Sequence, residues 1–255
     1  MSNRRRRLDV ELVRRGLASS RSLAADLVRD GRVLVNGAPT DRTSRLVDPG
    51  DAVTVTGAPA RFVGRGGEKL LAALEAFPDA RAMIAGSRAL DCGASTGGFT
   101  DCLLQEGADS VVALDVGHGQ LHERLRADVR VTVIERTNLR TADPQAVGAP
   151  FAVVVADLSF ISLRTVAPAL VAMCQPVATM IVLVKPQFEV GRADAARRRG
   201  VIDDDDLRRS ALASVTDSFS ALGCRPRGSI DCPVHGADGN REFLLWLEAP
   251  DRGRD

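Results

Sequence analysis

The sequence predicts an α/β protein in two parts: a small α+β domain at the N-terminus, then a larger Rossmann-like domain with a mostly parallel sheet. From residue 68 onward, apolar runs alternate with segments of helical periodicity, which is typical of a parallel sheet covered on both faces. The net charge also changes sign between the parts. Residues 1–66 carry 13 Arg against 7 Asp and Glu (+6), and residues 67–255 carry 21 Lys and Arg against 26 Asp and Glu (−5).

The N-terminal part has the pattern of two helices and two short strands. Apolar residues recur at helical spacing in residues 8–17 and again in residues 19–31, and each segment carries a glycine at or near its end. Residues 32–37 alternate like a strand and turn at Asn36-Gly37, and residues 51–57 give another short strand. The excess of arginine is large for so short a segment. A nucleic-acid-binding domain therefore explains it better than a solvated surface does.

A glycine-rich segment, GAPARFVGRGGEK (residues 57–69), separates the two parts. We expect an RNA-binding domain over residues 1–59, a linker over residues 60–67 and a second domain over residues 68–255.

The second domain alternates strands and helices. Its expected strands are residues 88–92, 111–116, 131–135, 151–157, 179–185, 227–232 and 243–249. Its expected helices are residues 69–77, 98–107, 119–127, 161–174 and 204–222. Only a short turn separates the last two strands, so we expect them to form an antiparallel hairpin at the sheet edge. This departs from a plain dinucleotide-binding fold and suits its methyltransferase variant.

Several classes of protein fit the composition poorly. Five cysteines without C-x-x-C spacing argue against a disulfide framework and a zinc site, and they suit a reducing cytoplasm. The N-terminal arginines have no apolar segment after them, so no signal peptide is expected. The longest apolar runs fall far short of the roughly 20 residues of a membrane helix. His118 and His122 lie one helical turn apart but lack a third ligand, so no metal site is expected.

A glycine-rich turn follows the first strand of the second domain and opens a helix. In LDCGASTGGFT (residues 90–100) the spacing is D-x-G-x-x-x-G-G, and glycines there allow a tight turn and close approach of a ligand. Asp115 ends the next strand, where a carboxylate can accept hydrogen bonds from both ribose hydroxyls of a nucleoside cofactor. The predicted cofactor contacts are Asp91, Gly93, Ala94, Ser95, Thr96, Gly97, Gly98, Asp115, Val116, Asp157 and Leu158.

The glycine spacing leaves two cofactor classes open. No lysine follows the glycines as in a phosphate-binding loop, so ATP and GTP do not fit. NAD(P) and S-adenosylmethionine both remain. The spacing is not G-x-G-x-x-G, and the expected edge hairpin favours S-adenosylmethionine.

The chain contains 32 arginines but only two lysines, Lys69 and Lys185. Lys185 ends the apolar run IVLV, and Asp157 ends the strand expected beside it, so both side chains should lie at the ligand-binding edge of the sheet. Arginine keeps its proton at any useful pH, whereas a lysine can lose it and act as a general base. A charged lysine can instead stabilise a developing alkoxide. Lysine at this place therefore predicts chemistry, although codon bias alone would explain how rare it is.

Ordered motifs along nearly the whole chain resemble the TlyA family of ribosomal RNA 2′-O-methyltransferases, also labelled hemolysin A. The segment RLDVELVRRGLASSRSLAADLVRDGRVLVNG resembles the αL-type RNA-binding domain first described in a small-subunit ribosomal protein. The segments FVGRGGEKL, DCGASTGGFTDCLL, LDVGHGQL, ERTN, VVADLSFISL, LVKPQFEVGR and GNREFLLWL are similar to segments of an FtsJ-like methyltransferase domain in the same order.

The resemblance implies an S-adenosylmethionine-dependent enzyme that methylates the ribose 2′-hydroxyl of cytidine in ribosomal RNA. It also implies a catalytic tetrad at Lys69, Asp157, Lys185 and Glu242. In this tetrad the two acids orient the lysines, the charge of Lys69 favours a neutral amine at Lys185, and no metal is needed.

Arginines of the N-terminal part are the expected RNA contacts, and Phe160 is expected to stack on an extruded base. The candidates are Arg7, Arg21, Arg32 and Arg65, with Arg4, Arg5, Arg6, Arg14 and Arg15 as weaker contacts. The expected partners are ribosomal RNA and ribosomal subunits, without membrane binding, and the sequence predicts no oligomeric state. Three alternatives stay open: a membrane-active hemolysin, a methyltransferase acting on an RNA base, and an RNA-binding factor with an inactive catalytic domain.

Overall fold

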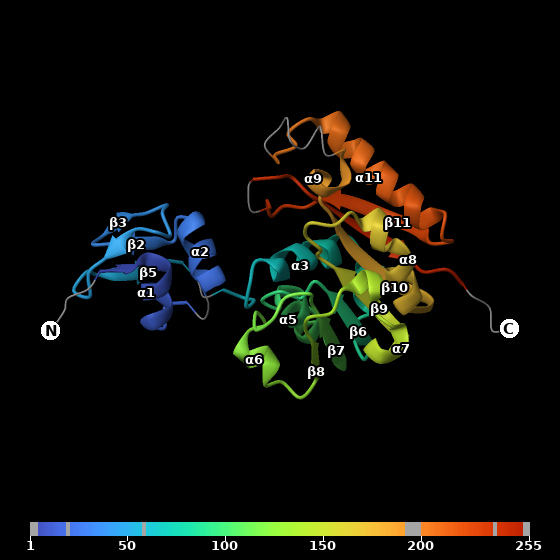
Figure 1. Cartoon of the computed structure of the whole chain (residues 1–255), viewed down its shortest axis with the longest axis horizontal. Coiled ribbons are helices and arrows are strands. Elements are labelled where there is room, and N and C mark those ends of the chain that lie inside the picture. The colour runs from blue at the N-terminus through green and yellow to red at the C-terminus, as the bar shows by residue number, and fades with distance from the viewer. Residues whose placement is uncertain (1–4, 19–20, 58–59, 192–199, 237–238, 252–255) are drawn as a thin grey trace. The chain divides into compact units, whose positions relative to one another are not determined.

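The computed structural model describes residues 5–18, 21–57, 60–191, 200–236 and 239–251 (Figure 1). Arg4, one of the expected RNA contacts, lies outside these residues. The chain divides into two compact units, Met1–Arg65 and Gly66–Asp255.

The first unit packs two helices and short strands around a small apolar core. Its elements are β1 (Arg6–Arg7), α1 (Leu8–Arg14), α2 (Arg21–Arg29), β2 (Val33–Val35), β3 (Ala38–Pro39), β4 (Leu46–Val47) and β5 (Val53–Val55). Strands β3, β2 and β5 form one antiparallel sheet, and β1 pairs with β4. Asn36 and Gly37 join β2 to β3 with φ angles of 53° and 79°, which gives the expected tight turn. The two expected helices and the expected strands are confirmed.

The second unit contains a seven-stranded sheet in the described part of the chain, with the order β11-β12-β10-β9-β6-β7-β8 (Figure 1). The strands are β6 (Arg88–Cys92), β7 (Ser110–Leu114), β8 (Val131–Ile134), β9 (Phe151–Ala156), β10 (Cys174–Val184), β11 (Arg225–Asp231) and β12 (Phe243–Glu248). The five strands from β10 to β8 are parallel, whereas β12 is antiparallel to both of its neighbours. The expected edge hairpin is therefore confirmed.

Helices surround this sheet, and they bury its central strands. They are α3 (Gly66–Ala76), α4 (Pro78–Ala82), α5 (Gly98–Gln105), α6 (Glu123–Arg126), η1 (Leu139–Thr141), α7 (Pro144–Val147), α8 (Leu163–Met173), α9 (Pro186–Glu189) and α11 (Asp205–Ser220). Helices α8 and α11 share one apolar core with the strands. Residues 181–184 of β10 are each at most 1% exposed, so both faces of the sheet are covered there.

The helix expected at residues 119–127 is wrong in its first half. Helix α6 begins only at Glu123, because Gly119 has a φ of 67° and donates its backbone N–H to the side chain of Glu135. The ring of His122 then caps α6 by accepting from the backbone of Arg124. The polar side chains of this segment thus give the backbone an alternative to helical hydrogen bonds.

The parallel strands bring four polar side chains to one edge of the sheet. Asp91 lies within β6, Asp115 follows β7, Asp157 follows β9 and Lys185 follows β10. Strand β9 is parallel to both of its partners, β6 and β10, so the carboxyl ends of these three strands are neighbours. The expectation that Asp157 and Lys185 lie on adjacent strands is confirmed.

A methyl group at Gly98 should destabilise the second unit. A Cβ there would lie 2.7 Å from the backbone nitrogen of Gly67 and 3.0 Å from the Cα of Gly66, so α5 could not pack against α3. We expect Gly98→Ala to lower the free energy of unfolding by about 1–3 kcal/mol, the usual range for overpacking. Calorimetric unfolding measures this change. Gly50→Ala is the control, because its Cβ meets nothing within 4 Å; an equal loss in both variants would contradict the prediction.

Candidate active site and RNA-binding surface

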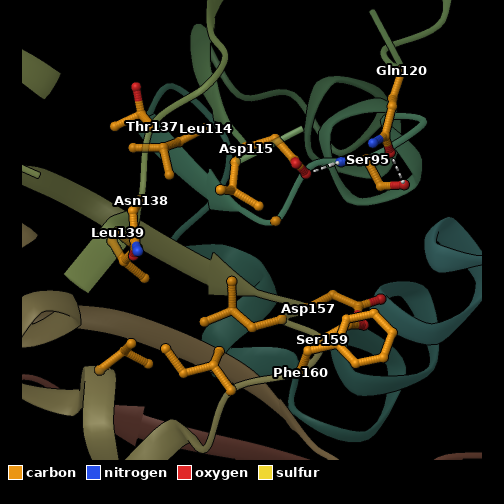
Figure 2. Close-up of a pocket in the computed structure, with 15 residues that line it drawn as sticks. Ser95, Leu114, Asp115, Gln120, Thr137, Asn138, Leu139, Asp157, Ser159 and Phe160 are labelled. Atoms are coloured by element: carbon orange, nitrogen blue, oxygen red, sulfur yellow. Dashed lines mark hydrogen bonds between the residues drawn. The ribbon is translucent and has the colours of Figure 1, made fainter. Parts of the chain in front are cut away.

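A pocket of about 490 Å³ opens at the carboxyl ends of the parallel strands (Figure 2). Its walls come mainly from the segments that follow β6, β7, β8 and β9, together with Leu114 of β7 and Val166 of α8. The lining residues are Gly93, Ser95, Leu114, Asp115, Val116, Gln120, Thr137, Asn138, Leu139, Asp157, Leu158, Ser159, Phe160, Ile161 and Val166. In a parallel sheet this edge is where ligands bind.

The carboxylate of Asp115 ties the glycine-rich turn to the loop after β7. It accepts from the backbone N–H of Ser95 at 2.8 Å and from that of Gly117 at 2.6 Å. The hydroxyl of Ser95 in turn donates to the side-chain oxygen of Gln120 (Figure 2). A carboxylate has about four lone-pair positions, so Asp115 can still accept from a ligand in the pocket.

The predicted cofactor residues separate into two groups. Gly93, Ser95, Asp115, Val116, Asp157 and Leu158 line the pocket, and Asp91, Ala94, Thr96, Gly97 and Gly98 do not. A Cβ on Gly93 would lie 2.5 Å from the carbonyl oxygen of Asp157, and one on Gly97 would lie 2.2 Å from Leu125. Gly97 and Gly98 thus shape the turn by allowing close packing within the protein.

Four polar pocket residues were not predicted from the sequence. Thr137 and Asn138 follow β8, Ser159 lies two residues after Asp157, and Gln120 lies in the loop after β7 (Figure 2). The first two could have been found, because β8 belongs to the same parallel set whose ends carry Asp115 and Asp157. Ser159 stands beside a predicted residue but carries no motif of its own.

The two lysines lie buried in contact with carboxylates. Lys69 Nζ, in the first turns of α3, donates to Glu242 Oε2 at 2.5 Å. Lys185 Nζ lies 2.6 Å from Asp157 Oδ1 and donates to the hydroxyl of Ser159 at 2.9 Å. Both lysines are less than 10% exposed. Buried ammonium groups need such partners, because an uncompensated charge away from water is strongly unfavourable.

Electrostatics link the two pairs. Burial alone would lower the pKa of Lys69, but the negative charge of Asp157 and the charge and hydrogen bond of Glu242 outweigh it. The pKa of Lys69 therefore lies above its ordinary value. Lys69, whose charge interacts with that of Asp157, is therefore held as an ammonium. The four residues that the resemblance assigned to a tetrad form one connected charge cluster beside the pocket.

The loop after β9 projects an aromatic ring from the pocket (Figure 2). Phe160 is 92% exposed and has a φ of 64°, a left-handed conformation that is unfavourable for a bulky residue. Its ring centroid lies 5.4 Å from that of Phe188, in the helix that follows Lys185. The fold thus keeps a large apolar ring in solvent next to the charge cluster.

Comparison with known proteins decides the family. A family model described as FtsJ-like methyltransferase matches residues 62–249, and one described as S4 domain matches residues 6–53. A 16S/23S rRNA (cytidine-2′-O)-methyltransferase named TlyA, from Mycobacterium tuberculosis, is 49% identical over 96% of this chain and 90% of its own length. The chain belongs to the TlyA family.

Other members of the TlyA family carry the hemolysin name. Hemolysin A of Brachyspira hyodysenteriae is 37% identical over 93% of this chain and 98% of its own length. The solved structure of a Streptococcus thermophilus protein named as a hemolysin superposes with a TM-score of 0.77 at 36% identity, covering 98% of this chain and 90% of that one. The expected family, the Rossmann-like methyltransferase fold and the N-terminal RNA-binding domain are confirmed.

The arginines of the S4 domain are largely engaged with acids or carbonyls of the same unit. Arg7 and Arg21 contact Asp9, Arg14 and Arg15 contact Glu11, and Arg6 lies 3.8 Å from Glu11. Arg5 contacts Asp48, Arg32 donates to the carbonyl of Thr56, and Arg65 contacts Asp26. These arginines differ in how much solvent they contact: the side chain of Arg21 is 63% exposed, whereas that of Arg15 is only 19% exposed.

Within the described residues, groups of three or more His, Cys, Asp or Glu side chains that could hold a metal ion are absent. No helix in that part of the chain combines the length and apolar character that crossing a membrane requires.

Asp91 should make the stability of this TlyA-family fold depend on pH. It is fully buried, and burial raises its pKa to about 7 although Thr100 donates to it at 2.6 Å. Its ordinary pKa is about 4, so between about pH 4 and 7 the folded state binds one more proton than the unfolded state. Stability should therefore fall as pH rises through this window, and Asp91→Asn should flatten that fall.

Denaturant unfolding followed through Trp246, the chain's single tryptophan, gives the free energy at each pH. Asp109→Asn removes an exposed carboxylate of the same unit and serves as the control. The prediction is wrong if Asp91→Asn keeps the wild-type pH dependence.

Proposed function

We infer that this chain transfers a methyl group to the ribose 2′-hydroxyl of cytidine in ribosomal RNA. The observation that carries this is the cluster of two buried lysines, buried Glu242 and partly exposed Asp157 beside the strand-end pocket, in a chain of the TlyA family. The cluster supplies proton transfer and charge stabilisation, which a hydroxyl needs before it can act as a nucleophile. An enzyme with this substrate would act in the cytoplasm.

The pocket residues fit S-adenosylmethionine, which supplies an electrophilic methyl group when bound. Asp115 would accept from the ribose hydroxyls, since its carboxylate lines the pocket and keeps lone pairs available. Val116, Leu139 and Ile161 give the pocket apolar walls that suit a purine ring. Gly93, where a Cβ would strike the end of β9, keeps the backbone close enough to form the pocket floor.

Lys185 is the residue that handles the proton of the attacking hydroxyl. Either it takes this proton as a general base, or as an ammonium it stabilises the emerging oxyanion. In both forms its Nζ is oriented by Asp157 and by the hydroxyl of Ser159. Lys69 and Glu242 complete the cluster: the ammonium of Lys69 compensates the carboxylates, and the Lys69–Glu242 hydrogen bond joins α3 to the segment before β12.

RNA binding uses both units of the chain. The S4 domain would contact phosphates, which position the substrate without reading its sequence. Phe160 would stack on the extruded target base, because its exposed ring stands next to Lys185 and the pocket. The substrate lies in the RNA of one or both ribosomal subunits.

Lys185→Arg separates proton transfer from simple positive charge. We expect kcat to fall at least about 100-fold, the lower range of general acid–base catalysis, because arginine does not release its proton. Methylation of ribosomal subunits from a strain that lacks the gene is measured by nucleoside mass spectrometry, which also distinguishes ribose from base methylation. Calorimetric binding of S-adenosylmethionine should stay unchanged and is the control. Activity near the wild-type level would exclude a general base at Lys185, and activity of Lys185→Ala at that level would exclude any role.

Arg7 and Arg21 should contribute to RNA affinity through phosphate contacts. We expect Arg7→Gln and Arg21→Gln each to weaken binding of a mixed-sequence RNA stem-loop and to reduce the slope of log K against log salt by about 1. Binding by the full chain is measured by fluorescence anisotropy over a series of salt concentrations. Arg225→Gln makes the same charge change at an exposed site of the second unit. A slope that is flat in the wild type would contradict the prediction.

A further inference from the structure

Two buried carboxylates lie beneath the exposed arginines of the S4 domain. Asp9 is 4% exposed and Glu11 is 1% exposed, and both belong to the first turn of α1. A domain that binds a polyanion gains nothing from negative charge as such, so these acids require a separate explanation.

Asp9 holds arginines from two different segments. Arg7, just before α1, donates from Nε to Oδ1 at 3.0 Å and from Nη2 to Oδ2 at 3.1 Å, in a bidentate pair. Arg21, at the start of α2, donates from Nη2 to the same Oδ2 at 2.8 Å. One carboxylate oxygen therefore brings two guanidinium groups together, although the residues are far apart in the sequence.

Glu11 repeats this arrangement on the other side of the helix. Arg14 pairs with it through two hydrogen bonds of 2.8 and 2.6 Å, and Arg15 donates to Oε1 at 2.7 Å. The other two nitrogens of Arg15 donate to the carbonyls of Asp48, Pro49 and Asp51. Arg15 thus connects helix and loop, whereas Arg14 keeps donors for another partner.

The exposed arginines retain donors that point to an anion outside the chain. A guanidinium has five N–H groups. In the contacts with described residues, the Nη1 group of Arg7 and the Nε and Nη1 groups of Arg21 are not used. The side chains of these two arginines are 47% and 63% exposed. Each is therefore fixed by one edge of its guanidinium and accessible by the other.

We propose that Asp9 and Glu11 are positioning residues of a phosphate-binding surface, which hold Arg7, Arg21 and Arg14 in the arrangement that RNA phosphates meet. This rests on the proposed function, in which the S4 domain contacts ribosomal RNA. Two effects of each acid oppose one another. Repulsion between a carboxylate and a phosphate about 8 Å apart in water weakens binding only about twofold. Ordering a free arginine side chain weakens it by more than about tenfold, so positioning outweighs repulsion.

Both acids keep their charge under the conditions in which RNA binds. Burial raises the pKa of Asp9, but hydrogen bonds from Arg7 and Arg21 bring it down to about 2. Hydrogen bonds from Arg14 and Arg15 lower the pKa of Glu11 to about 2 as well, against the effect of burial. Because these values lie below the ordinary value of about 4, the ion pairs are complete above about pH 4 and are lost only as pH falls towards 2.

Asp9→Asn in the full chain tests the proposal, since it removes a negative charge yet should weaken RNA binding. We expect the Kd for the mixed-sequence RNA stem-loop to rise about tenfold, the equivalent of one charge-assisted hydrogen bond. Asp30→Asn is the matched control, because Asp30 is an exposed carboxylate of the same unit. It should bind RNA as tightly as the wild type or slightly more tightly. Glu11→Gln, measured in the same way, is the second variant and should also weaken binding.

A double-mutant cycle separates positioning from loss of structure. In a chain that already carries Arg7→Gln and Arg21→Gln, adding Asp9→Asn should change the Kd by less than about twofold, because no arginine remains for it to position. A further large loss in that background would mean that Asp9 acts through the fold, and it would overturn the proposal.

The remaining outcomes distinguish failure of the positioning role from failure of the phosphate contacts. If Asp9→Asn tightens RNA binding as Asp30→Asn does while Arg7→Gln and Arg21→Gln weaken it, the positioning role is wrong and the phosphate contacts stand. If the arginine variants bind RNA like the wild type, the phosphate contacts themselves are wrong.

Discussion

The ion pairs of Lys185 with Asp157 and of Lys69 with Glu242 are the constraint on which the catalytic unit depends. Neither lysine could be buried without its carboxylate, and the partners come from segments far apart in the chain, 173 residues in the case of Lys69 and Glu242. The pairs form only if β9, β10 and β12 are neighbours and α3 packs nearby. The order of the strands is therefore a requirement of these ion pairs as well as of the core.

The glycine-rich turn illustrates how packing prepares a binding site. Gly97 and Gly98 face other parts of the protein, where a Cβ would strike Leu125 or the backbone of Gly66 and Gly67. Their absence of side chains lets α5 begin close to α3 and α6. That position presents the backbone of the turn to the pocket, where Asp115 fixes it by a hydrogen bond to Ser95. Residues that do not line the pocket can thus determine its shape.

The sequence predicts the site residues that stand at the ends of strands. It predicts fewer of the contacts that join segments far apart in the chain. Asp157 and Lys185 could be placed together because parallel neighbouring strands end at one edge. The partnership of Lys69 and Glu242 has no local signal, and it came from the family resemblance alone. The sequence also ranks Arg14 and Arg15 together as weaker RNA contacts, whereas in the fold Arg15 donates to three carbonyls and Arg14 stays half exposed. Donor geometry is a tertiary property, so no spacing rule reveals it.

In both units a carboxylate of low exposure orients a cationic side chain. The cation is an arginine in the first unit and a lysine in the second. In the S4 domain Asp9 holds arginines, whose charge persists at every useful pH and suits permanent attraction to phosphate. In the catalytic unit Asp157 and Glu242 hold the chain's two lysines, whose protons can be exchanged. An arginine at position 185 would also bring a positive charge to Asp157, so the sign of the charge alone does not select lysine there. In the proposed reaction a proton moves at Lys185, which accounts for lysine at that position but not for Lys69, whose raised pKa keeps it an ammonium.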